Sequence, residues 1–321
     1  MARNDLVQLA KNPVPSGATV GLMKAADGLP LRYAVWQASR GPKRGTVCLF
    51  GGRTEFIEKY FEVVADLRRR GFAVATMDWR GQGGSGRMLT NHRKGYVRDF
   101  AQFDADLLRF MKDVVLPDCP PPFVALAHSM GGNIILRSAA MPGCWFEKIV
   151  LSAPMVRLNP KSLRWGLKTT RMMTEMICAF GGSRIYVPGG SDDYGETWPF
   201  EGNTVTTDRE RYNRNNAIVE AAPDLGLGAA TFGWLRAALR SMELLHGRDY
   251  PARVHVPILF AIAGEDRIAS SRGIEDFAVR LKLARHIVIP HARHEIMQER
   301  DDLRQQFWAA FDGFLGIGEA S

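Results

Sequence analysis

The 321-residue sequence predicts an α/β fold, with a doubly wound, mostly parallel sheet and an inserted helical segment. Two observations lead to this prediction. Short apolar runs bounded by glycine or proline alternate with stretches of helical periodicity, a pattern typical of parallel strands that are covered on both faces. The alternation stops between residues 155 and 251 and then resumes.

The apolar runs predict the strands of the sheet. Buried strands are expected at 46–50, 72–77, 123–127, 149–152, 258–263 and 286–289. Helical periodicity predicts helices at 55–70, 96–115, 130–140, 271–283 and 301–314. Before all of these, the runs 18–24 and 31–36 flank a turn-like Asp-Gly-Leu-Pro segment, which predicts an opening antiparallel hairpin.

Residues 155–251 are expected to form a helical cap. This stretch is rich in methionine and in glycine and proline pairs, and it lies between two predicted core strands. The core would then be discontinuous in sequence, with 1–154 and 252–321 forming one α/β unit. No internal repeat is found.

Composition narrows the class of partner. Hydrophobic residues make up 46% and charged residues 24%, as in ordinary compact proteins. The net charge of +8 comes from scattered residues without a nucleic-acid-binding pattern, so no nucleic-acid partner is expected. A diffuse positive surface is compatible with peripheral contact to acidic lipids. No signal for an oligomeric state is present.

Cysteine usage and hydropathy indicate the compartment. The four cysteines, Cys48, Cys119, Cys144 and Cys178, have no CxxC spacing and read as free thiols. The first 20 residues lack an apolar signal core, and no run of about 18 apolar residues occurs. We therefore expect a cytoplasmic protein, in contact at most with the inner face of the membrane.

The strongest motif surrounds Ser129. A predicted strand at 123–127 is followed by His-Ser-Met-Gly-Gly and then by a predicted helix. This strand, turn and helix is the arrangement of a nucleophile elbow, which lifts a serine hydroxyl above the edge of the sheet. Small residues are needed two positions on either side, and here they are Ala127 and Gly131. The motif predicts Ser129 as a catalytic nucleophile.

An acid and a base are expected after later strands, in that order along the chain. The strand at 258–263 leads into Glu265 and Asp266, and the strand at 286–289 leads into His291 and His294. Asp266 is favoured over Glu265, which lies nearer the end of its strand. Spacing alone does not separate the two histidines.

Acyl transfer also needs two N–H donors for the tetrahedral oxyanion. One is expected from Met130, the residue after the nucleophile, and the other from Gly52, in the loop after the strand 46–50. The glycine pattern at 81–86 matches the dinucleotide-binding fingerprint G-x-G-x-x-G. Because the residues after it are polar and do not begin an apolar helix, no dinucleotide site is expected.

These motifs resemble the bacterial lysophospholipases and monoacylglycerol lipases of the α/β-hydrolase superfamily. The similar segments are 52–60, 78–85, 127–132, 203–214, 263–266 and 292–295. The resemblance spans about residues 31–314 and implies His294 as the base, because the family's histidine precedes a glutamate. Phe50 departs from the family pattern, which often has histidine there.

The predicted function is hydrolysis of a carboxylic ester through an acyl-enzyme, without a metal or another cofactor. By resemblance the substrate is a monoacyl lipid, with Met172, Met173 and Met176 of the cap against the acyl chain. Packing between cap and core explains these methionines equally well. The alternatives are a hydrolase of short esters, thioesters, lactones or amides and a non-catalytic binding protein of the same fold.

Overall fold

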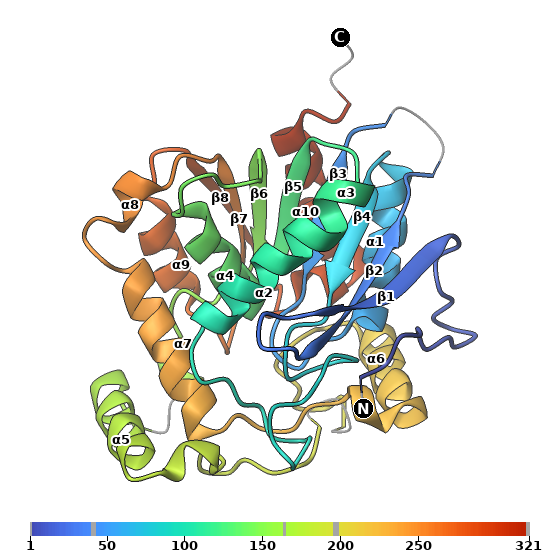
Figure 1. The fold of residues 1–321 in the computed structure, drawn as a ribbon. Helices are drawn as coiled ribbons and strands as arrows, with labels where there is room; N and C mark the ends of the chain where they lie inside the picture. The colour runs from blue at the N-terminus through green and yellow to red at the C-terminus, as the bar shows by residue number, and fades with distance from the viewer. Residues whose placement is uncertain (1, 40–42, 163–164, 195–198, 319–321) are drawn as a thin grey trace.

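The computed structural model describes residues 2–39, 43–162, 165–194 and 199–318. These residues form a sheet with the strand order β1-β2-β4-β3-β5-β6-β7-β8 (Figure 1). The strands are β1 (Ala18–Lys24), β2 (Pro30–Trp36), β3 (Thr46–Phe50), β4 (Ala73–Met77), β5 (Phe123–His128), β6 (Lys148–Ser152), β7 (Ile258–Ala263) and β8 (Ala284–Ile289). Each lies within about two residues of its predicted range.

The sheet is antiparallel at one edge and parallel over the rest. β1 pairs with β2, and β2 with β4, in antiparallel register, whereas all pairs from β4 to β8 are parallel. Central strands such as β3 and β7 are buried along their whole length. The predicted fold class is thus confirmed, including the opening hairpin.

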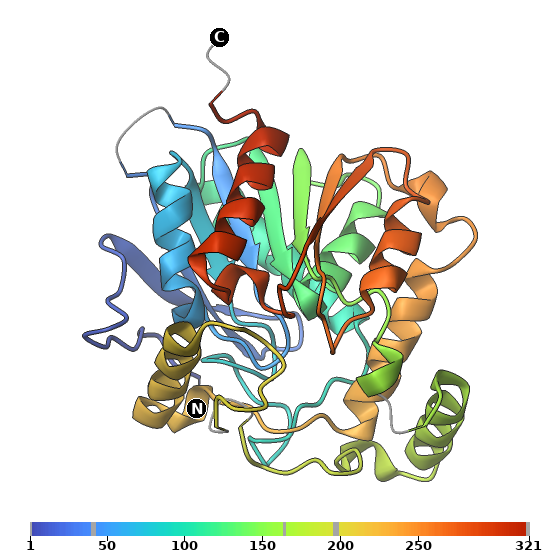
Figure 2. The same cartoon turned by 180° about the vertical axis from the view of Figure 1, so that it is seen from behind.

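Helices cover both faces of the sheet. One apolar cluster joins the sheet to α2 (Ala101–Phe110), α4 (Ser129–Ala139), α7 (Phe232–Leu245) and α9 (Ser271–Ala278). A second cluster joins the opposite face to α1 (Phe61–Arg69) and α10 (Asp301–Leu315), which lie in front in Figure 2. The α2 helix continues through a π-helical turn (Met111–Val115) into α3 (Leu116–Asp118).

Two helices begin later than the periodicity predicted. The helix predicted at 55–70 begins at Ile57, with a 3₁₀ turn (Ile57–Tyr60) that leads into α1. It starts late because Thr54 has a left-handed backbone and the Glu55 side chain folds back onto the loop. The α2 helix starts at Ala101, whose N–H is accepted by Asp99. The preceding Gly95 is extended and forms a bridge with Ala230.

Most of the segment between β6 and β7 lies beyond the carboxyl ends of the parallel strands, in the lower part of Figure 1, whereas its last helix lies toward the amino ends of β6 and β7. Its helices are α5 (Leu167–Ala179), α6 (Arg209–Ala221), α7 and α8 (Tyr250–Arg253). Two parts of the expected cap, residues 163–164 and 195–198, lie outside the described residues. The α7 helix packs against α5 and also contributes to the apolar core beside α4.

Candidate functional site

Ser129 sits at the turn between β5 and α4. Its backbone φ is 49°, the left-handed conformation that a sharp strand-to-helix turn requires. A Cβ on Gly131 would lie 2.5 Å from the carbonyl oxygen of Gly51 and 2.8 Å from that of Phe50. Because both obstructing atoms belong to the backbone, only glycine fits there, which accounts for the small residue after the serine.

Three predicted side chains form a continuous hydrogen-bonded chain. His294 Nε2 lies 2.9 Å from Ser129 Oγ, and His294 Nδ1 lies 2.7 Å from Asp266 Oδ2. The other carboxylate oxygen of Asp266 accepts the N–H groups of Ile268 and Ala269 at 2.8 and 2.9 Å. Asp266 is therefore fixed by its own loop while it orients the imidazole.

The electrostatics of the pair match this geometry. Burial alone would raise the pKa of Asp266, but the neighbouring His294 lowers it below its usual value. Burial would lower the pKa of His294, but the Asp266 carboxylate raises it above 6.5. The arrangement thus stabilises a protonated imidazole next to an ionised carboxylate, as proton transfer from Ser129 requires.

Glu265 and His291, the alternatives to Asp266 and His294, contact each other. His291 Nδ1 lies 3.0 Å from Glu265 Oε1, and both side chains are exposed. This pair is on the surface, away from the buried Ser129. The structure thus brings Asp266 and His294 to the serine and leaves Glu265 and His291 outside.

The His128 ring packs beside the His294 ring. Its ring centroid is 4.8 Å from that of His294, and its Nδ1 lies 3.0 Å from the carbonyl oxygen of Ser152. Burial lowers the pKa of His128 to about 4. The ring is therefore neutral near pH 7 and does not compete with His294 for a proton.

The Gly52 N–H, one of the two expected oxyanion donors, is occupied in this structure. It donates to Glu55 Oε2 across a tight turn. A Cβ on Gly52 would lie 3.1 Å from the Ser129 Cβ, so the loop backbone passes directly beside the hydroxyl. Met130, the residue of the second expected donor, is fully buried at the start of α4.

Sequence reasoning missed a buried charged network next to this loop. Lys59 Nζ lies 3.0 Å from Glu55 and 2.6 Å from Glu295, the residue after the histidine. Tyr60 also donates to Glu55, at 2.5 Å. Lys59 and His128 lower the pKa of Glu55 to about 2 against its burial, whereas burial raises that of Glu295. The i, i+4 spacing of Glu55 and Lys59 was the available signal, but such pairs usually lie on the surface.

Ser129 and His294 open into a cavity of about 420 Å³. Its apolar wall comes mainly from the segment before β7, and its polar wall from the loop after β3. A second, more apolar cavity of about 210 Å³ shares Leu158, Ser162 and Ala230 with it. Phe50 lines neither cavity and stacks on Trp79 in the core, with ring centroids 5.5 Å apart.

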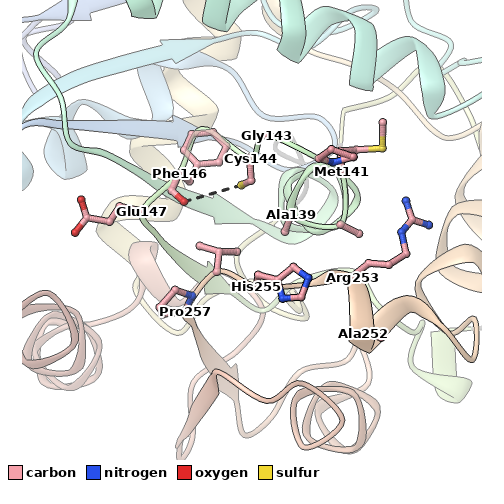
Figure 3. Close-up of a pocket in the computed structure, with 13 residues that line it drawn as sticks. Ala139, Met141, Gly143, Cys144, Phe146, Glu147, Ala252, Arg253, His255 and Pro257 are labelled. Atoms are coloured by element: carbon pink, nitrogen blue, oxygen red, sulfur yellow. Dashed lines mark hydrogen bonds between the residues drawn. The ribbon is translucent and has the colours of Figure 1, made fainter.

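A larger cavity, of about 690 Å³, lies at the other end of the sheet. Figure 3 shows that its lining comes from the end of α4 and from the residues that precede β6 and β7. The Cys144 thiol points to the carbonyl oxygen of Phe146, 4.0 Å away. This cavity contains none of the residues that contact Ser129, so volume alone does not identify the reactive site.

The three methionines predicted to contact the acyl chain lie on α5 and do not share one environment. Met173 lines the apolar cavity beside the Ser129 cavity. Met172 and Met176 are 60% and 55% exposed on the outer side of α5 and line neither cavity. The structure therefore places one of the three predicted acyl contacts near the site and turns two away from it.

The glycines at 81–86 serve a structural purpose. A Cβ on Gly83 would lie 2.3 Å from the carboxylate of Asp78, and one on Gly84 would lie 2.3 Å from Arg32 Nε. These two charged residues form a fully buried ion pair at 2.6 Å. The loop wraps this pair, and the next helix in the described chain starts only at Ala101. Within the described residues no group of His, Cys, Asp and Glu side chains could hold a metal ion.

Comparison with known proteins agrees with this geometry. Residues 41–301 match a family model described as serine aminopeptidase, S33 (Hydrolase_4). Lysophospholipase L2 of Escherichia coli (strain K12) is 31% identical over 290 residues, covering 87% of this chain and 82% of that protein. The monoacylglycerol lipase of Mycolicibacterium smegmatis is 32% identical over 133 residues, covering 41% of this chain and 45% of its own.

Solved structures show the same fold at lower identity. A soluble variant of monoglyceride lipase from Saccharomyces cerevisiae, in complex with a substrate analog, matches with a TM-score of 0.74 and 20% identity, covering 94% of this chain and 97% of that one. A carboxyl esterase from Bacillus coagulans also gives 0.74, at 18% identity, covering 94% and 99%. The motif resemblance is confirmed, and the chain belongs to the Hydrolase_4 family of serine hydrolases with the α/β-hydrolase fold.

Proposed function

We propose that this protein hydrolyses the carboxylic ester of a monoacyl lipid, as a lysophospholipase or monoacylglycerol lipase does. The observation that carries the proposal is the hydrogen-bonded chain from Ser129 through His294 to Asp266, at 2.9 and 2.7 Å, opening into a cavity of about 420 Å³. Relatives named for these two activities support the choice of substrate.

In the proposed reaction Ser129 Oγ attacks the ester carbonyl carbon while His294 Nε2 takes the hydroxyl proton. The resulting imidazolium is stabilised by Asp266 and then gives its proton to the departing glycerol oxygen as the ester bond breaks. A water molecule, deprotonated by His294, then attacks the acyl-enzyme. Collapse of the second tetrahedral species releases the fatty acid and restores the Ser129 hydroxyl.

We assign the oxyanion donors to the N–H groups of Met130 and Gly52. The first lies at the N-terminus of α4, where the helix dipole favours negative charge. The second lies beside Ser129, since a Cβ on Gly52 would be only 3.1 Å from the Ser129 Cβ. Since Gly52 donates to Glu55 in the resting structure, the oxyanion replaces that carboxylate when it forms.

Residues 155–251 are assigned as the cap that shelters the acyl chain. The helices α5 and α6 of this segment lie beyond the strand ends that carry Ser129 and His294 (Figure 1). The adjoining apolar cavity, with Trp165, Met173 and Leu235 in its wall, continues from the Ser129 cavity. Such a cavity suits an alkyl chain, because each methylene removed from water contributes about 0.8 kcal/mol.

We further propose that α5 rests on an anionic lipid surface. Met172, Met176 and Phe180 recur at i, i+4 on the side of α5 opposite its buried threonines, and Phe180 is 89% exposed. Lys168 extends this stripe by one turn, and Arg184 lies exposed just beyond it. Exposed apolar residues flanked by cations are typical of helices that lie in a membrane interface.

The proposed location is the cytoplasm, at the inner face of the membrane. All four cysteines are free thiols, as a reducing compartment favours. No helix among the described residues combines the length and the apolar composition that crossing a bilayer would require.

The function is tested with the purified protein and its Ser129→Ala variant. A fluorophosphonate probe should label the native protein at Ser129 and leave the variant unlabelled. Hydrolysis of a dodecanoyl lysophospholipid and of a monododecanoylglycerol should fall by at least about 10⁴-fold in the variant. Ser138→Ala, on the same helix, is the matched control. Labelling that persists in Ser129→Ala would place the nucleophile elsewhere, and activity that peaks at acetyl esters would favour a short-chain esterase.

A further inference from the structure

A cavity of about 240 Å³ lies between α5 and α7 and takes no part in the proposed reaction. The two helices pack side by side (Figure 1), and the cavity is lined by the first turns of α5, by the second half of α7 and by the residues that follow β6. We call it the α5–α7 groove. It contains neither Ser129 nor His294, so it is distinct from the reactive site.

One apolar face of α7 connects this groove with the cavity assigned to the acyl chain. Leu235 lines the acyl cavity, whereas Leu239 and Met242, four and seven residues later, line the groove. Residues at this spacing lie on the same face of a helix. Leu158 lines the groove, the acyl cavity and the Ser129 cavity. The groove thus continues the apolar surface on which the acyl chain is placed.

Positive charge exceeds negative charge along the groove. Arg157, Lys168 and Arg171 line it, and Glu243, which also lines it, binds Arg171 at 2.7 Å. Among the described lining residues, Arg157 and Lys168 then face no carboxylate. His246 adds no charge near pH 7, because its Nε2 donates to a backbone carbonyl and burial lowers its pKa. Apolar walls with two such cations suit an amphiphile that has one negative charge.

Arg157 is positioned by the loop that follows β7 and by α9. Its carbonyl oxygen accepts the N–H of Ser270 at 2.9 Å, and a Cβ on Gly273 would lie 2.9 Å from its Cδ. The neighbouring Leu158 forms a bridge with Ala269. This wall of the groove is therefore fixed before any ligand arrives, which lowers the entropy lost on binding.

We propose that the α5–α7 groove binds a fatty-acid anion, the product of the proposed hydrolysis, at a site separate from the acyl cavity. Its carboxylate lies at Arg157 and Lys168, and its chain lies against Leu239 and Met242 of α7. The inference rests on the proposed function, which supplies the fatty acid. Of the two products of that reaction, only the fatty acid has both an alkyl chain and a negative charge.

The test measures binding after the acyl cavity has been filled. The native protein is first labelled at Ser129 with dodecyl fluorophosphonate, whose chain takes the place of the acyl group. Isothermal titration calorimetry then measures the binding of decanoate to the labelled protein. One equivalent should bind. The neutral 1-decanol should bind about tenfold more weakly, because it has no charge for the two cations to attract.

A first variant tests the groove itself. Leu167→Asp places a carboxylate on its wall and should weaken decanoate binding at least about tenfold, through charge repulsion and lost apolar contact. Leu167 is 48% exposed at the start of α5, where an acidic residue favours the helix, so the variant should fold. Thr169→Asp is the matched control. It adds the same charge to the same turn at an exposed position outside the groove and should change binding less than about twofold.

A second variant tests the two cations. The double variant Arg157→Gln/Lys168→Gln should weaken decanoate binding about tenfold and leave the binding of 1-decanol unchanged. Its control is Arg240→Gln/Arg272→Gln, which also removes two exposed cations, neither of them in the groove. That control should bind decanoate as the native protein does. Circular dichroism checks that all variants are folded.

The outcomes separate the inference from the function beneath it. Labelled protein that binds no decanoate, or equal weakening by Leu167→Asp and Thr169→Asp, would overturn the groove as a fatty-acid site. Equal binding of decanoate and 1-decanol, or an equal loss in the two double variants, would overturn the role of Arg157 and Lys168. A native protein that cleaves neither a lysophospholipid nor a monoacylglycerol would instead overturn the proposed function, and the effect of Leu167→Asp on decanoate binding would still decide the inference.

Discussion

The edge of the sheet beside Ser129 differs from the α5 helix in how far the local sequence determines where a side chain lies. At the sheet edge Ser129, Asp266 and His294 each follow the end of a parallel strand, so the strand order brings the loops that carry them to one place. On α5, neighbouring methionines separate, with Met173 facing inward and Met172 outward. Strand ends place side chains through backbone pairing, whereas a helix places them through its rotation against whatever it covers.

The largest expected effect tests the sheet edge. His294→Ala should lower kcat for p-nitrophenyl butyrate by about 10³-fold or more, because Ser129 then has no proton acceptor. His291→Ala is the matched control, since that exposed side chain contacts Glu265 on the surface and should change kcat less than about twofold. Circular dichroism checks that both variants are folded. A larger loss in His291→Ala would exchange the roles of the two histidines.

A smaller effect follows from the pKa of the base. Because Asp266 raises the pKa of His294 above 6.5, and because only the neutral imidazole accepts a proton, kcat/KM should fall on the acid side of a midpoint above pH 6.5. Below that midpoint the loss should be about tenfold per pH unit. The profile of His291→Ala should coincide with that of the native protein. A native midpoint below pH 6 would contradict the raised pKa.

The smallest effects test the cap, through two variants of one helix. In the native protein kcat/KM for p-nitrophenyl esters should rise about three- to fourfold per added carbon until the cavity is full. Met173→Ser should flatten this slope, whereas the double variant Met172→Ser/Met176→Ser should keep it. The double variant should instead bind phosphatidylglycerol vesicles more weakly, by on the order of tenfold, in a sedimentation assay.

If α5 is rotated in solution, the double variant should flatten the chain-length slope and Met173→Ser should weaken vesicle binding. A flattened slope in the double variant would place Met172 and Met176 against the acyl chain, as the sequence predicts. Vesicle binding that does not depend on either variant, or that is equal for neutral and anionic vesicles, would contradict α5 as an anionic-lipid contact.

Much of the core could be predicted because its signals are local. Buried strands show as apolar runs, and the turn at Ser129 shows as small residues two positions on either side of the serine; at Gly131 the structure leaves no room for a Cβ. The sequence favours Asp266 over Glu265, and the family resemblance selects His294 over His291. In the structure Asp266 is fixed by N–H groups of its own loop, whereas Glu265 reaches the surface.

The remaining parts of the site depend on contacts between distant segments. The contact between Lys59 and Glu295 could not be predicted, because nothing in the local pattern shows that residue 295 returns to residue 59. The Arg53 side chain contacts Trp234 of α7 and the carbonyl oxygen of Gly228 in the preceding loop, both far from it along the chain. Such contacts between distant segments leave no periodicity to detect, since each partner lies in an otherwise unremarkable stretch of sequence.

The bond between Glu55 and the Gly52 N–H has a consequence for the catalytic cycle. Between turnovers a side-chain carboxylate occupies the donor that the proposed oxyanion requires, so the resting loop already solvates an anion. Each acylation then exchanges one negative partner for another, while Lys59 and Tyr60 retain the released carboxylate. The loop is thus arranged for negative charge before any substrate arrives, and its amide is not left unsatisfied when the product departs.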